Sequence, residues 1–243
     1  MPLWFANGTD ATTGNRVITA PIAAPDQRGS EIAWPFRGAR DFHTLMRSDV
    51  SISTAINNTA RFAYLEPFGE MMPLQETAQV GSLIDGGYFE NEGLQTTLEL
   101  AEWLGRQSPG GRSVRPIIVQ ATGDGEANVT AADVMTCDIA SDQPFLPSDH
   151  SAWQILAPLL GFYHVRGGHS VVLLRQARDQ FCSEPPRFVH FYLPGDDNGR
   201  AIPLNWVLSD AIGQFIWTAF VSKRVSNATE LDRLRAALTA KRD

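Results

Sequence analysis

The sequence predicts an α/β fold in which a mainly parallel sheet lies between helical layers, a three-layer α/β/α arrangement. Segments typical of strands, such as residues 80–84 and 188–193, alternate with segments typical of helices, such as residues 92–107. Residues 116–119 form a continuous apolar run, which suits a strand covered on both faces of a parallel sheet. Together these observations favour the α/β class.

The N-terminal part begins with an apolar run, a polar turn and a second apolar run, which predicts strand, turn and strand. Residues 22–47 are rich in Pro, Arg and Gly without clear periodicity, so a long surface loop is expected there. Ser48 and Asp49 are candidate caps of the helix that follows, and residues 80–84 form a short strand ending at Asp85.

The C-terminal part is predicted to be richer in helix. Residues 151–182 form a helical region that we expect to be broken or kinked near Pro158 and the two glycines Gly167 and Gly168. A second apolar helix is expected over residues 204–223. We assign residues 1–225 to one domain and residues 226–243 to a C-terminal helix, because Asn227 and Glu230 have the spacing of a capping box.

Composition excludes some classes of function. The chain has 243 residues, 20 Lys+Arg against 27 Asp+Glu, and no run of basic residues, which disfavours nucleic acid as a partner. No basic leader followed by an apolar stretch opens the chain, and no apolar window is long enough to span a membrane. Cys137 and Cys182 are the only cysteines; their spacing fits either a disulfide or two isolated buried thiols.

The most informative segment is Asp85-Gly86-Gly87, directly after the strand at residues 80–84. Asp-Gly and Gly-Gly are common turn dipeptides, and on its own this tripeptide favours a structural turn. Its context favours chemistry, since open α/β sheets place their reactive groups at the C-terminal ends of strands. Glycines without a Cβ atom would also let another element approach the carboxylate closely.

Four segments in order resemble the patatin-like phospholipases, as found in bacteria. Asp85-Gly86-Gly87 is similar to the family motif that carries the aspartate of a Ser-Asp dyad. Residues 2–14 resemble the strand and turn after the nucleophile, and residues 53–67 the helix before the aspartate. Residues 202–209 resemble a segment near the end of the domain. The resemblance covers most of residues 1 to about 220.

The resemblance implies a lipid acyl hydrolase in which Asp85 accepts the proton of a serine nucleophile, with Gly86 and Gly87 as supporting positions. The family's Gly-x-Ser-x-Gly motif and oxyanion loop have no counterpart in residues 1–243: neither Ser113 nor Ser170 has the second glycine. We therefore expect an N-terminally truncated domain that is inactive by itself. The alternative is a non-catalytic remnant that binds lipid or protein.

The implied partners are a lipid or another ester and, from the Trp and Phe content, a membrane surface; no cofactor and no metal is expected. The localisation stays open between cytoplasmic and membrane-associated.

Five histidines lack metal-ligand spacing, and residues 124–128 only superficially resemble a calcium loop. Asp10, with Thr9 and Thr13, either lines the site or caps its own turn; we favour the turn. The helices near 151–182 and 204–223 either line an acyl groove or pack in the core.

Overall fold

The computed structural model describes residues 2–22, 34–61, 66–74, 78–90, 92–123, 137, 157–183, 185–193, 209–221 and 227–240. The chain divides into two compact units, residues 1–103 and residues 104–243, and each is described by itself. Both units combine strands with helices, which confirms the predicted α/β class. Within the described residues, no helix has the length and apolar character needed to cross a membrane.

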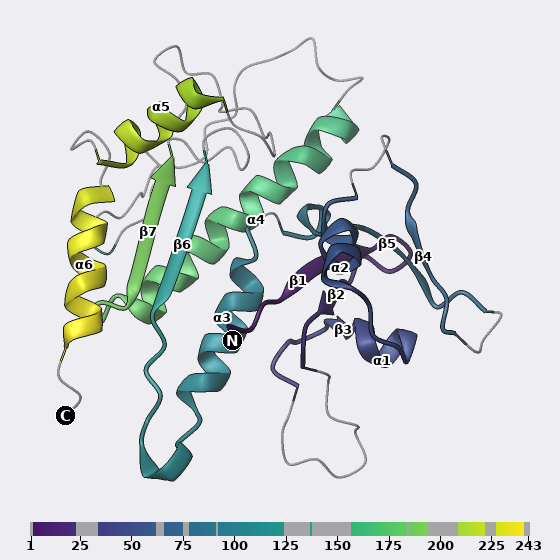
Figure 1. Cartoon of the computed structure of the whole chain (residues 1–243), viewed down its shortest axis with the longest axis horizontal. Coiled ribbons are helices and arrows are strands. Elements are labelled where there is room, and N and C mark those ends of the chain that lie inside the picture. Colours follow the sequence, from purple (N-terminus) through teal and green to yellow (C-terminus); the bar gives the residue numbers. More distant parts are fainter. Residues whose placement is uncertain are drawn as a thin grey trace. The chain divides into compact units, whose positions relative to one another are not determined.

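The first unit contains a five-stranded sheet with the strand order β3-β2-β1-β5-β4 (Figure 1). Only β2 and β3 pair in parallel, so this sheet is mostly antiparallel and the expectation of a mainly parallel sheet is wrong for it. The connection from β1 to β2, residues 11–15, is far too short for the crossover that parallel neighbours need. The strands are β1 (Ala6–Asp10), β2 (Arg16–Thr19), β3 (Arg40–Asp41), β4 (Gly69–Met71) and β5 (Gly81–Asp85).

Three helices complete the first unit: α1 (Phe42–Met46), α2 (Ile52–Thr59) and most of α3 (Leu94–Gly105). The α1 helix and β3 lie where a long irregular loop was expected. Asp41 starts α1, because its carboxylate accepts from the backbone N–H groups of His43 and Thr44. Ser51, rather than the predicted Ser48 and Asp49, caps α2. One cluster of buried apolar side chains in the unit consists of Val17, Phe42, Met71 and Leu83.

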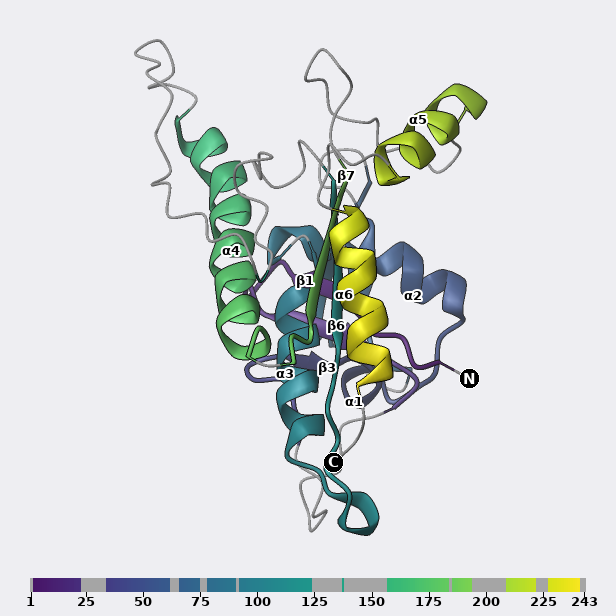
Figure 2. The same cartoon turned by 90° about the vertical axis from the view of Figure 1, so that its left-hand side faces the viewer.

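The second unit is built around two parallel strands, β6 (Ile118–Gly123) and β7 (Phe188–Leu193). Its helices are α4 (Ala157–Phe181), α5 (Asp210–Val221) and α6 (Asn227–Thr239). Figure 2 shows α4 and α6 on opposite sides of the β6–β7 pair. In β6, Ile118 and Gln120 are buried while Val119 is 49% exposed, so this strand is not covered on both faces as its apolar run suggested.

Helix α4 runs without interruption from Ala157 to Phe181, so of the two expectations, a break or a kink, the break at Gly167 and Gly168 is wrong. Glycine lowers helix propensity but keeps its backbone N–H, and 25 residues of helix supply hydrogen bonds on both sides of the pair. At the end of α4, Cys182 forms a disulfide with Cys137. The structure thus selects the disulfide from the two alternatives left open by the sequence.

Candidate functional site

Asp85 ends β5 in the first unit and lies opposite Gly8 of β1. Its backbone N–H donates to the carbonyl oxygen of Arg61 over 3.0 Å. One carboxylate oxygen, Oδ1, accepts from the backbone N–H of Gly87 over 2.7 Å, and the side chain is half-buried. Within the described residues, the other oxygen, Oδ2, has no hydrogen-bond partner. Asp85 therefore has one oxygen fixed and one oxygen left to accept a proton or a hydrogen bond.

The hydrogen bond to Gly87 also makes Asp85 the cap of a 3-10 turn, Gly86–Tyr88. A turn-capping aspartate and a proton-accepting aspartate use different oxygens here, so the geometry accommodates both interpretations of the motif. What the cap contributes to chemistry is orientation: it holds the carboxylate in one rotamer at the end of the strand. This is the arrangement that a general base needs before a substrate arrives.

Among the described glycines, Gly86 is the one at which the backbone of another strand comes too close for a side chain. A Cβ atom added to Gly86 would lie 2.1 Å from the carbonyl oxygen of Asn7, a distance that no side chain can adopt without moving the backbone. Thr9 reinforces this contact, because its hydroxyl donates to the Gly86 carbonyl over 3.4 Å and accepts from the Phe89 N–H over 3.2 Å. The close approach expected from the glycines is therefore present, but it joins Gly86 to β1 rather than bringing an element to the carboxylate.

A buried polar network joins β1 and β2 to α3. The guanidinium of Arg16 donates to the Thr96 hydroxyl over 2.7 Å and forms an ion pair with Glu99 over 2.6 Å. Thr96 in turn donates to Oδ1 of Asn7 over 2.9 Å. Because Asn7 contacts Gly86, this network fixes the strand that supports the Asp85 turn. Sequence reasoning missed it, since an isolated arginine in a short strand carries no signal of burial.

Asp10 is fully buried at the end of β1 and is part of a turn, as the sequence favoured. Burial alone would raise the pKa of Asp10, but hydrogen bonds from Thr12, Ser82 and Thr13 outweigh it and lower the pKa to about 2. The Arg40 guanidinium, 2.7 Å from Oδ2, also favours the charged form. Both carboxylate oxygens are thus engaged, which suits a structural anion and leaves Asp10 poorly placed to exchange protons.

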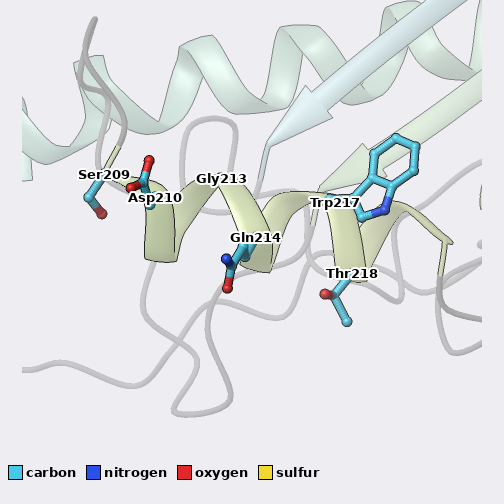
Figure 3. A pocket seen from close by; sticks show the side chains of 6 residues that line it. All are labelled: Ser209, Asp210, Gly213, Gln214, Trp217 and Thr218. Atoms are coloured by element: carbon cyan, nitrogen blue, oxygen red, sulfur yellow. The ribbon is translucent and has the colours of Figure 1, made fainter.

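An open hollow lies on α5 in the second unit, shown in Figure 3. Trp217 is 67% exposed beside it, but much of the lining is polar. An acyl chain requires a concave and mostly apolar surface, so this hollow does not supply the groove that the apolar helices suggested. The lining residues are Ser209, Asp210, Gly213, Gln214, Trp217 and Thr218.

Within the described residues, no group of three or more His, Cys, Asp or Glu side chains could hold a metal ion. Residues 124–128, considered above as a calcium loop, lie outside the described ranges. No family model, no curated protein and no solved structure matches this chain. The interpretation of Asp85 therefore depends on its own geometry and on the resemblance of the sequence segments around it.

Proposed function

We propose that Asp85 is the proton-accepting member of a Ser-Asp dyad, and that the chain is part of a patatin-like lipid acyl hydrolase. The observation that supports this most directly is the state of the Asp85 carboxylate. One oxygen is fixed by Gly87, while the other has no partner in the described residues, at the C-terminal end of a strand. A serine hydroxyl placed against Oδ2 would lose its proton to Asp85 as it attacked an ester carbonyl.

The proposal includes a three-layer, mainly parallel fold of the patatin type. The parallel β6–β7 pair with α4 and α6 on opposite sides supports it, while the mostly antiparallel five-stranded sheet does not. Residues 1–243 contain no Gly-x-Ser-x-Gly motif, so hydrolysis requires a serine from outside them. The same observation favours a second candidate function, a non-catalytic protein that binds lipid or a protein partner through this unit.

The test starts from the DNA directly upstream of Met1, which on this proposal encodes Gly-x-Ser-x-Gly in frame. The extended chain should hydrolyse p-nitrophenyl esters and react with a fluorophosphonate. Replacing Asp85 with asparagine keeps the hydrogen bond from Gly87 but removes the base, and should lower kcat/KM by about 100- to 10,000-fold. The matched control is Asp49→Asn, because that side chain is 96% exposed.

Two results would count against the dyad. One is a stop codon or an unrelated gene in place of the motif. The other is fluorophosphonate labelling of residues 1–243 alone, which would require a different nucleophile. If the chain is inert to the probe, no extended form exists, and vesicles of neutral lipid still retain it, the binding protein is the better description.

A further inference from the structure

In the second unit, β6 and β7 begin near the end of α4 (Figure 1), and an arginine precedes each of the two strands. The backbone ties these three ends together: Ile118 N–H donates to the Arg187 carbonyl over 2.8 Å, and Arg187 N–H donates to the Phe181 carbonyl over 2.7 Å. Arg187 directly precedes β7, and Arg115 lies three residues before β6. The adjacent starts of parallel strands therefore bring Arg115 and Arg187 to the same end of the unit.

The guanidinium of Arg187 is held in place. It lies 5.2 Å from the ring centroid of Phe181, and one of its terminal nitrogens, Nη1, donates to the Pro116 carbonyl over 3.2 Å. A guanidinium has five N–H donors. In the described part of the chain, this is the one hydrogen bond that the Arg187 side chain makes. The stacking and the hydrogen bond thus fix the group while leaving most of its donors for another acceptor.

The two positive charges have no acidic partner among the described residues, where neither arginine forms an ion pair. Burial lowers the pKa of Arg187, and the nearby positive charge of Arg115 lowers it further. Repulsion between like charges costs free energy, and an anion between them would offset that cost. Two neighbouring arginines with no acidic partner among the described residues are unusual in a chain with a net charge of −7.

We propose that Arg115 and Arg187 form a binding site for a phosphate-type oxyanion. Arg187 supplies a fixed planar group of donors, and the exposed Arg115, in the segment that leads into β6, supplies further donors to the same anion. A phosphate has more than two acceptor oxygens, which point in different directions, so each of two guanidiniums can bind its own pair of oxygens more easily than on a carboxylate. The phosphate belongs either to a soluble molecule or to a lipid head group. The site is independent of the dyad proposed at Asp85.

Thermal unfolding with increasing inorganic phosphate, at constant ionic strength set by sodium chloride, tests the site. The Tm of the unaltered chain should rise with phosphate beyond the effect of chloride. Arg115→Gln should weaken the apparent phosphate affinity at least about tenfold, because a charge-assisted pair is lost. Arg235→Gln is the matched control, since Arg235 is exposed on α6 and pairs with Asp232. Flotation with phosphatidylcholine vesicles, with and without phosphatidic acid, distinguishes a lipid source from a soluble one.

Arg115→Gln is the decisive variant, because Arg187→Gln also loses the contacts to Phe181 and Pro116 and is expected to be less stable. The proposal is overturned if phosphate has no effect beyond chloride, or if the control loses as much affinity as Arg115→Gln. It is also overturned if the Glu184→Gln variant binds phosphate and the unaltered chain does not. That result would mean that an internal acid, three residues before Arg187 in the sequence, already neutralises the pair.

Discussion

Replacing Asp10 with asparagine should make the stability of the chain less dependent on acid. The pKa of Asp10 is lowered from 3.8 to about 2, because hydrogen bonds to the buried carboxylate outweigh the cost of burying it. A difference of nearly two pKa units corresponds to about 2 kcal/mol of stability that the ionised group supplies. Since the folded pKa is the lower one, this contribution is complete above pH 4 and is lost as the pH falls through 2.

The contribution of the Asp10 carboxylate to the free energy of unfolding can be measured at each pH. The free energy of unfolding, measured by urea titration between pH 7 and pH 2, should be higher for the unaltered chain than for Asp10→Asn at pH 7. The difference should be at least about 2 kcal/mol, because Arg40 also loses its partner. About half of the pH-dependent part should remain at pH 3, and little of it at pH 2.

The control is Asp49→Asn, whose side chain is almost fully exposed. Because Asp49 takes part in an exposed pair with His43, its replacement should change the free energy of unfolding by less than about 1 kcal/mol. A difference between Asp10→Asn and the unaltered chain that stays constant from pH 7 to pH 2 would refute the argument. It would show that Asp10 titrates in the folded chain as it does in the unfolded chain, so that its hydrogen bonds do not stabilise the anion.

Three further changes should lower the free energy of unfolding. Gly86→Ala places a methyl group against the Asn7 carbonyl and should cost about 3 kcal/mol by urea titration, while displacing the neighbouring aspartate. Cys182→Ser removes a disulfide that joins residues 45 positions apart and should cost up to about 4 kcal/mol; reductant should destabilise only the unaltered chain. Glu230→Gln removes the carboxylate that pairs with the buried Arg233 and should cost about 3 kcal/mol in the same assay.

Each of these predictions has a control in the same chain. Gly105→Ala should be tolerated, because no atom lies within 4 Å of the added methyl group. Asp232→Asn, which breaks an exposed pair on α6, should change stability by less than about 1 kcal/mol. A loss in Asp232→Asn equal to that in Glu230→Gln would contradict the role of burial. Equal sensitivity of Cys182→Ser and the unaltered chain to reductant would show that the bridge does not contribute.

Local patterns in the sequence predicted the elements better than their assembly. Residues 188–193 form β7 as expected, because a run of β-branched and aromatic residues bounded by prolines leaves few alternatives. The direction of pairing in the first sheet was not predictable in this way. Alternation with helices suggested parallel strands, but residues 11–15 form a tight turn that returns the chain beside itself, and this local geometry determined the antiparallel pairing.

At the candidate site, the sequence predicted that Asp85 ends a strand, because this depends on residues adjacent in the chain. It could not show that Asn7 is the group packed against Gly86, which depends on strand register over 79 positions. The Arg115–Arg187 pair was not apparent either. The two residues are 72 positions apart, and only the start of two neighbouring strands brings them together.

The contact between α6 and β7 has a consequence for the outer edge of that strand. The backbone N–H of His190 donates over 2.9 Å to the buried carboxylate of Glu230 and not to β6, so it faces the far edge of β7. An unpaired strand edge is a template for edge-to-edge aggregation. Here an incoming strand would have to displace the Glu230 carboxylate, which also pairs with Arg233. This pairing therefore disfavours the addition of a second chain at this edge.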